Sequence, residues 1–487
     1  MIESRSVCGT RREAKRLEIQ LEIQEMGLKA EPGRATYLMA TSAVSSSSRR
    51  LEVLAGHLPS PFTPLTPATG GEDLKKAEGN EPGPSVYPAQ CAAQSPIRRR
   101  VIVVGAGLSG IMASVELLDR GIVGASSGGG DDEDLVIFEK GPDVGGTWYW
   151  NRYPGCACDV PSIAYLPFLH RAKYVPSKKY VSGGEIQQHL SRCAEELGVA
   201  DRTHFNTRVV SACFDEDTAL WRVETRREAR QDGGSGGNVR GNGGNVSGES
   251  HESGRRGAGS CVWEAPFLIV GVGPLSTPHF PDIPGLDVFK AAGGTVMHTA
   301  KWDSTVPLEG MRVGVVGTGA TAVQVVPEIA KVAKTLTVFQ RTAAWCSPRE
   351  DAPTTDAVAA ALTKDTTYED GVNAAFNTAN DTYNDFINDA AKNERLQRKL
   401  ERTLRAQVHD PKVAAALTPS YPVGCKRLCV VDDYWPSFNR PNVHLVVTGK
   451  SGVSHVSERG PVMGDGTEHS VDVRWTRGNL LTRTSVY

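Results

Sequence analysis

The chain has 487 residues, of which 39% are hydrophobic, and a net charge of -2 at neutral pH. This length suits two or three domains, and the small net charge excludes a global field that attracts nucleic acid or acidic membranes. The sequence has no apolar run of about 18 residues, so it predicts no membrane span.

The N-terminal segment, residues 1–97, is rich in Ser, Pro, Gly, Arg and Glu and predicts a disordered extension. Only LEIQLEIQEMGL, residues 17–28, indicates a helix there. The segment has no apolar secretory region, although the sequence from Met39, MATSAVSSSSRR, would suit an organellar transit peptide if translation began there. Further Gly-rich stretches at 125–134 and 226–260 predict surface-loop insertions.

Two segments predict a buried strand, a glycine-rich turn and a helix. They are VIVVGAGLSGIMASVELL from Val101 and VGVVGTGATAVQVVPEIA from Val313. The expected fold class is therefore α/β, with two Rossmann-like dinucleotide-binding domains and a helical insertion. We expect a first nucleotide domain over 98–295, a second over 296–349 and 421–442, helices over 350–420, and a partial return to the first domain over 443–487.

The first turn contains G-x-G-x-x-G. Gly105 allows the tight turn, Gly107 lets the backbone approach a pyrophosphate, and Gly110 lets helix and strand pack closely. The next strand, LVIFEK, ends in Glu139, whose carboxylate can accept both ribose hydroxyls; the insertion at 125–134 accounts for its distance from the turn. The predicted nucleotide contacts are Gly105, Gly107, Leu108, Ser109, Gly110 and Glu139.

The second turn is the G-x-G-x-x-A variant, and its next strand, TLTVFQR, ends without an acid. A guanidinium there can hold a 2′-phosphate that a carboxylate would repel, so Arg341 favours NADP over NAD, unless it is only a solvated strand-end residue. The predicted contacts are Gly317, Thr318, Gly319, Ala320, Thr321, Ala322, Gln340 and Arg341. A diol-type site followed by a 2′-phosphate-type site suggests FAD and NADPH, with hydride passing from NADPH to the flavin.

An aromatic stretch, GGTWYWNRYPGCACD at residues 145–159, follows the first site. It fits (A/G)-G-x-W-x-x-x-x-(F/Y)-P-(G/M)-x-x-x-D at every fixed position: Gly145, Gly146, Trp148, Tyr153, Pro154, Gly155 and Asp159. It thereby resembles the signature of Baeyer–Villiger monooxygenases. Glycines let the backbone approach a flavin, and aromatic rings exclude water. The predicted flavin contacts here are Gly146, Thr147, Trp148, Asp159 and Tyr165.

A second family signature, F-x-G-x-x-x-H-x-x-x-W-(P/D), is matched by FKAAGGTVMHTAKWD except at its first position. Ala292 stands where the phenylalanine belongs, and Phe289 lies three residues upstream, as a short insertion would explain. The resemblance assigns His298 and Trp302 to coupling between domains; the alternative for His298 is a satisfied core histidine.

A third match is VGCKRLCVVDDYWPSFNRPNV, which carries the Lys-Arg pair of the family. The resemblance implies that Lys426 helps Arg341 to hold the 2′-phosphate, that Arg427 is catalytic and that Asp159 orients it. The alternatives are a turn-capping role for Asp159 and a surface ion pair for Arg427.

The resemblance as a whole implies an FAD- and NADPH-dependent monooxygenase that inserts one oxygen atom of O₂ into a ketone through a flavin C4a-peroxide. The alternatives are oxidation of N or S atoms, or a non-catalytic remnant, because the tail RWTRGNLLTRTSVY lacks the expected apolar strand and suggests a truncated C-terminal part. The expected partners are a ketone and O₂, with no nucleic acid and no obligate protein partner. The ten cysteines lack disulfide or metal spacing, which predicts no metal site and a reducing, cytoplasmic setting.

Overall fold

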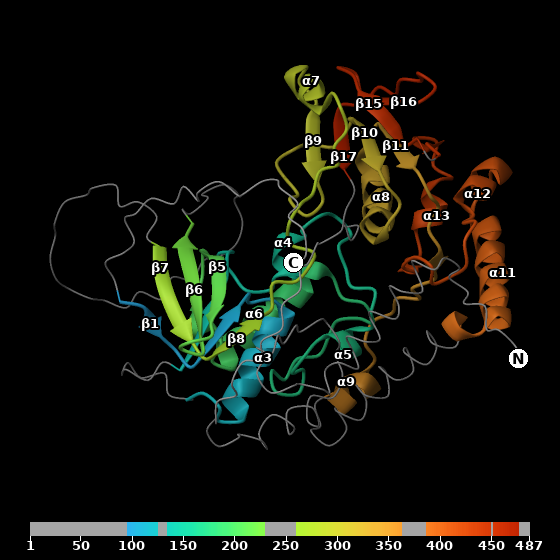
Figure 1. Ribbon diagram of the computed structural model, residues 1–487. Helices are drawn as coiled ribbons and strands as arrows, with labels where there is room; N and C mark the ends of the chain where they lie inside the picture. The colour runs from blue at the N-terminus through green and yellow to red at the C-terminus, as the bar shows by residue number, and fades with distance from the viewer. Residues whose placement is uncertain (1–94, 125–133, 229–259, 363–385, 450, 477–487) are drawn as a thin grey trace, which may run out of the picture.

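The computed structural model describes residues 95–124, 134–228, 260–362, 386–449 and 451–476. The predicted extension up to residue 94, with the helix at 17–28 and the segment from Met39, lies outside the described residues. The insertions also lie outside them at 125–133 and 229–259. The described chain forms two lobes, each built around one parallel sheet (Figure 1). We call them the first and the second unit.

The first unit has a parallel sheet of strand order β4-β3-β2-β8, with the bounds Thr203–His204, Leu135–Phe138, Val101–Val104 and Phe267–Val270. Alternate side chains of β2 and β3 point to opposite faces. One face, with Val103 and Ile137, packs against helices α3 (Leu108–Asp119) and α6 (Gly183–Glu196). Short helices α4 (Thr147–Trp150), α5 (Ser162–Tyr165) and η3 (Ala200–Arg202) complete this side.

A second sheet covers the other face of the first unit. Its order is β1-β7-β6-β5, with the bounds Ile97–Arg98, Ser260–Ala265, Leu220–Arg227 and Thr207–Asp215. Ile102 and Phe138 of the parallel sheet pack against Trp221 and Trp263 of this sheet. The undescribed residues 229–259 connect its neighbouring strands β6 and β7.

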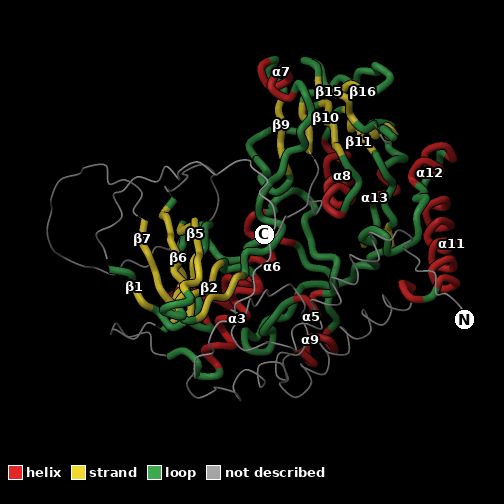
Figure 2. Tube along the Cα trace, viewed as in Figure 1, coloured by secondary structure: helices red, strands yellow, loops and turns green. Residues whose placement is uncertain are grey.

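The second unit has a parallel sheet of order β14-β11-β10-β17-β9, with the bounds Val443–Val447, Thr335–Gln340, Arg312–Val316, Val473–Thr476 and Thr295–His298. Figure 2 labels β9, β10 and β11 of this sheet. Helix α8 (Ala320–Val332) packs on one face. On the other side, α7 (Leu286–Ala291) packs with β15 (Val453–Val456), which pairs with β16 (Pro461–Met463).

The described chain between β11 and β14 contains four named helices: α9 (Asp356–Leu362), α11 (Ala390–Gln407), α12 (Pro411–Leu417) and α13 (Tyr434–Ser437). Capping fixes the start of two of them, because the side chain of Asp389 accepts a hydrogen bond from Lys392 N and that of Asp410 accepts one from Lys412 N. A short parallel pair, β12 (Cys346–Ser347) with β13 (Cys429–Val430), brings both ends of this segment together.

The predicted return of residues 443–487 to the first domain is wrong for the residues described. Strand β14 pairs with β11, and β17 pairs with both β10 and β9, so these strands belong to the second unit. The tail was expected to lack a strand, yet β17 includes its first three residues, 474–476. The reason is that backbone groups, not apolar side chains, hold a strand between two partners. Helix α7 also joins the second unit, ahead of the predicted boundary at 295.

Candidate active site

The turn after β2 is closed around its own backbone. Gly105 has φ of +98°, and a Cβ atom there would lie 2.5 Å from the carbonyl oxygen of Gly271. A Cβ atom on Gly110 would lie 1.9 Å from the carbonyl oxygen of Gly105. Helix α3 starts with Leu108 and Ser109, and its first turn holds no acidic residue. Its unpaired N–H groups can therefore receive an anion.

The carboxylate of Glu139 is fixed beside this turn. The residue is 4% exposed; Oε2 accepts a hydrogen bond from Ala106 N and Oε1 one from Gly141 N, both at 2.8 Å. A carboxylate has about four lone-pair sites, so two remain for other donors.

The aromatic stretch adjoins the same turn. Gly146 has φ of +52°, and a Cβ atom on it would lie 2.8 Å from Gly107 Cα. Thr147 opens α4, and Trp148 is buried, with its Nε1 donating to the Tyr165 hydroxyl at 2.8 Å. Burial raises the pKa of Tyr165, so its hydroxyl stays protonated. The structure therefore places Gly146 against the glycine turn that precedes α3, with Trp148 and Tyr165 hydrogen-bonded to each other nearby in sequence.

Asp159 and Arg427 form a bidentate ion pair across 268 residues of sequence. The Arg427 Nε donates to Asp159 Oδ2 at 3.0 Å, and its Nη2 donates to Oδ1 at 2.5 Å. The carboxylate side chain is 14% exposed and the guanidinium side chain 65% exposed. Both carboxylate oxygens serve the guanidinium, which favours the orienting role of Asp159 over turn capping. The other edge of the guanidinium stays accessible.

The turn after β10 is open. Gly317 has φ of +115°, and nothing lies within 4 Å of the position a Cβ atom on Gly319 would take. Helix α8 begins at Ala320 without an acid in its first turn, while Thr321 and Ala322 are buried. The Thr318 hydroxyl donates to the carbonyl of Thr342 at 2.5 Å.

Gln340, a predicted cofactor contact, is buried at the end of β11. Its side chain is 2% exposed, and its Nε2 donates to the carbonyl of Ala416 in α12 at 2.7 Å. The prediction of a cofactor contact there is therefore replaced by a packing role between β11 and α12. Arg341, the next residue, is exposed.

Lys426 lies on the segment that returns from the helices. Its Nζ is 4.8 Å from the centroid of the Tyr421 ring, and the Tyr421 hydroxyl donates to the carbonyl of Ala343 at 2.8 Å. Because Ala343 follows Arg341 by two residues, Tyr421 links Lys426 to the end of β11.

The region of the second family signature is a packed core. His298 is buried, and its Nδ1 accepts from Ala300 N at 3.1 Å. Trp302 packs on the main core of the second unit. Phe289 lies directly on Gly294, since a Cβ atom there would fall 2.3 Å from its ring. The aromatic ring that the signature places next to this glycine is thus supplied from three residues further upstream.

Sequence reasoning missed Gln324. This buried α8 residue accepts from the Tyr153 hydroxyl at 2.8 Å and donates to the carbonyl of Ala157 at 2.9 Å. Both partners belong to the aromatic stretch of the first unit. A buried amide within an apolar helix was the available signal, because buried polar groups require partners.

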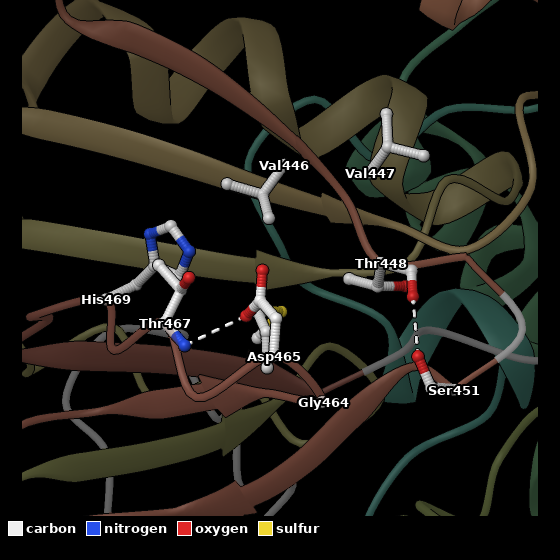
Figure 3. Close-up of a pocket in the computed structure, with 9 residues that line it drawn as sticks. Val446, Val447, Thr448, Ser451, Gly464, Asp465, Thr467 and His469 are labelled. Carbon is white, nitrogen blue, oxygen red and sulfur yellow. Dashed lines mark hydrogen bonds between the residues drawn. The ribbon is translucent and has the colours of Figure 1, made fainter.

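A separate cleft of about 300 Å³ lies where β14 ends (Figure 3). Val446, Val447 and Thr448 meet Asp465 and His469 there, from the chain that follows β16. None of the predicted site residues lines it.

The described residues contain no group of three or more His, Cys, Asp or Glu able to hold a metal ion. The eight cysteines among them are free. Of the helices in the described segments, none is both long and apolar enough to cross a membrane.

Comparison with known proteins identifies relatives of the chain. The model of an NAD(P)-binding Rossmann-like domain matches residues 103–175. The FAD-binding monooxygenase trt3 of Aspergillus terreus is 34% identical over 426 residues, or 77% of this chain and 60% of its own length. A Baeyer–Villiger monooxygenase of Streptomyces coelicolor is 34% identical over 380 residues, or 77% of this chain and 62% of its own. The chain is therefore related to the Baeyer–Villiger monooxygenases, which are class B flavin monooxygenases.

Solved structures of family members share this fold. The polycyclic ketone monooxygenase of Thermothelomyces thermophila has a TM-score of 0.63 at 30% identity, over 80% of this chain and 64% of its own. OTEMO in complex with FAD and NADP has a TM-score of 0.62 at 28% identity, over 78% of this chain and 71% of its own. The chain spans about three fifths of the length of the curated relatives named above.

Proposed function

We propose that the chain binds FAD in the first unit and NADPH in the second, and converts a ketone and O₂ into an ester or lactone. The observation that carries this proposal is the bidentate Asp159–Arg427 pair next to the aromatic stretch. Relatives named for FAD binding and Baeyer–Villiger chemistry support it, as does a solved relative that holds FAD and NADP.

The first unit fits FAD. The open end of α3 would take the pyrophosphate, with the glycine turn allowing close approach. Glu139 has lone pairs left for the ribose hydroxyls, and Gly146 with Thr147 and Trp148 would border the flavin ring. Tyr165 holds the Trp148 indole in place.

The second unit fits NADPH. The space around Gly319 leaves the start of α8 open to a pyrophosphate. Arg341 and Lys426 would hold the 2′-phosphate, since Tyr421 links the segment of Lys426 to the end of β11. His298 and Trp302 retain their proposed role in coupling the units.

When bound, FAD would supply the activated oxygen that attacks the ketone carbon, and NADPH would supply the electrons. Arg427 provides a fixed positive charge that favours the anionic, nucleophilic form of that oxygen without donating a proton. Asp159 holds the guanidinium in one orientation through two charge-assisted hydrogen bonds. Trp148 and the aromatic residues beside it exclude water from the site.

The test is to incubate the purified chain with NADPH, ¹⁸O₂ and a panel of cyclic and linear ketones. We expect an ester or lactone that carries one ¹⁸O atom. Arg427→Ala should lower the rate of ester formation by about 10²-fold or more, as loss of a preorganised charge does. The matched control is Arg398→Ala, which removes an exposed ion pair with Glu394 in α11 and should leave the rate unchanged.

Two results would contradict the proposal. A flavin-loaded protein that oxidises NADPH and yields only hydrogen peroxide would rule out ketone oxygenation. Oxidation of sulfides or amines at full rate in Arg427→Ala, without any ester from the parent, would indicate a heteroatom monooxygenase instead.

A further inference from the structure

The aromatic stretch of the first unit is held by one residue of the second, Gln324. Its Oε1 accepts from the Tyr153 hydroxyl and its Nε2 donates to the Ala157 carbonyl, so one amide binds both sides of the turn that leads to Asp159. We propose that Gln324 is a positioning residue that fixes Asp159, and through it Arg427, relative to helix α8. The role of Gln324 in catalysis rests on the proposed function. Its role in holding the turn rests on the hydrogen bonds alone.

The turn between these hydrogen bonds lies directly on α8. Gly155 has φ of +78°, and a Cβ atom there would lie 2.5 Å from the carbonyl oxygen of Gln324 and 3.1 Å from Glu328 Cγ. Cys156 N donates to the carbonyl of Tyr153 at 3.1 Å, which closes the turn. The backbone at 153–157 is therefore in contact with the helix, and its position follows that of α8.

Tyr153 also belongs to the core of the second unit. Its side chain is 8% exposed and lies in one hydrophobic cluster with Val323, Val326 and the strands β10 and β11. Burial raises its pKa well above the ordinary value, so the hydroxyl remains a donor to Gln324. A residue of the first unit is thus anchored in the second.

The consequence concerns the two proposed cofactor sites. Helix α8 begins at the open turn proposed for the NADPH pyrophosphate, and Gln324 lies further along the same helix. Asp159 follows Ala157 by two residues and holds the Arg427 guanidinium. Gln324 therefore connects the helix at the NADPH site to the charge beside the proposed flavin site.

We call the two hydrogen bonds of Gln324, to Tyr153 and to Ala157, the clamp. Hydrogen exchange measured by mass spectrometry tests the clamp without any need for activity. In Gln324→Met, amide exchange in the segments 153–160 and 424–430 should become about tenfold faster, because two buried hydrogen bonds are lost. The matched control is Gln397→Met, which removes only the bond from Gln397 to Asn393 within α11. Unchanged exchange in the two segments, or an equal rise in the control, would overturn the proposal.

A milder pair of variants covers the case in which Gln324→Met does not fold. Tyr153→Phe removes the hydroxyl that Gln324 accepts, whereas Tyr434→Phe removes a buried hydroxyl that makes no hydrogen bond within the described residues of the same core. Only Tyr153→Phe should speed exchange at 153–160. Equal behaviour of both variants would contradict the clamp.

Turnover then tests whether Gln324 acts through Asp159. Gln324→Met should raise the hydrogen peroxide formed per NADPH and leave the KM for NADPH within about twofold, while adding nothing further in an Asp159→Asn background. Independent, multiplying effects of the two changes would overturn the positioning role. If the parent forms no ester, the proposed function fails, whereas exchange still decides the clamp.

Discussion

The two glycine-rich turns have similar sequence patterns, but their glycines serve different purposes. In the first unit, the turn is filled by its own chain, since a Cβ atom on Gly110 would lie 1.9 Å from the Gly105 carbonyl oxygen. In the second unit, Ala322 takes the corresponding place and is buried without difficulty, and the space at Gly319 is open. The first turn needs glycine for packing within the protein, and the second for access to a ligand.

The charged residues that follow the neighbouring strands also differ in how firmly the protein itself holds them. β3 is followed by Glu139, buried and held by two backbone N–H groups. β11 ends in Gln340, which is buried on α12, and it is Arg341 that reaches solvent. The acidic group is thus preorganised by the fold, whereas the basic group is exposed to solvent.

Gly110→Ala should have the largest effect. The added methyl group meets backbone rather than a flexible side chain, so we expect a loss of about 3 kcal/mol in the free energy of unfolding, measured by denaturant titration. The reverse change in the second unit, Ala322→Gly, should cost about 1 to 2 kcal/mol, through helix propensity and the loss of one buried methyl group. Losses of equal size would show that the two turns are packed alike.

Substitution of the charged residues at the two strand ends should weaken the binding of one cofactor at a time. Arg341→Ala should weaken NADPH binding about 10- to 100-fold, since a charged hydrogen bond to the phosphate is lost, and should leave NADH binding and flavin content unchanged. Glu139→Gln should weaken FAD binding about tenfold and spare the affinity for NADPH. Titration by intrinsic fluorescence measures both. A change that weakened both cofactors equally would contradict the assignment of one site to each unit.

Which parts of the fold and of the site could be predicted from the sequence depends on how far apart the interacting residues lie along the chain. The glycine turns, Glu139 and the aromatic stretch follow from local spacing, because each acts within one strand–turn–helix unit. The Asp159–Arg427 pair, 268 residues apart, came only from the family resemblance.

Gln340 and Gln324 show what local patterns miss. Gln340 was misassigned because a carbonyl 76 residues away, that of Ala416, determines its burial. Gln324 was overlooked because its partners lie 171 and 167 residues away. Strand β17 was missed for a related reason, since its two neighbours supply backbone hydrogen bonds that its own side chains do not announce.

Acidic pH should lower the stability of the first unit, because His189 is buried in it. This α6 residue is buried, and burial lowers its pKa below the ordinary 6.5, although the hydrogen bond between its Nε2 and the Pro167 carbonyl opposes the shift. Below pH 6.5 the unfolded chain therefore binds a proton that the folded chain does not, and stability falls with pH by at most about 1.4 kcal/mol per unit.

Denaturant titrations between neutral and mildly acidic pH measure this slope. His189→Gln should make it shallower, because the glutamine keeps a donor for Pro167 and does not titrate. The control is His444→Gln on the exposed side of β14, which should leave the slope as it is. If His189→Gln left the slope unaltered, other groups would be responsible for acid unfolding.

Gly319→Ala should have the smallest effect on stability and is the sharpest test of the open turn. The backbone at Gly319 is extended, with φ of -80°, which any residue adopts, and a methyl group there meets nothing within 4 Å. The free energy of unfolding should therefore change by less than about 0.5 kcal/mol. NADPH affinity should still fall several-fold, because the methyl group occupies the space that the pyrophosphate needs at the start of α8. A variant with unchanged stability and unchanged affinity would place the dinucleotide elsewhere, and the likeness between the two turns would then be one of fold alone.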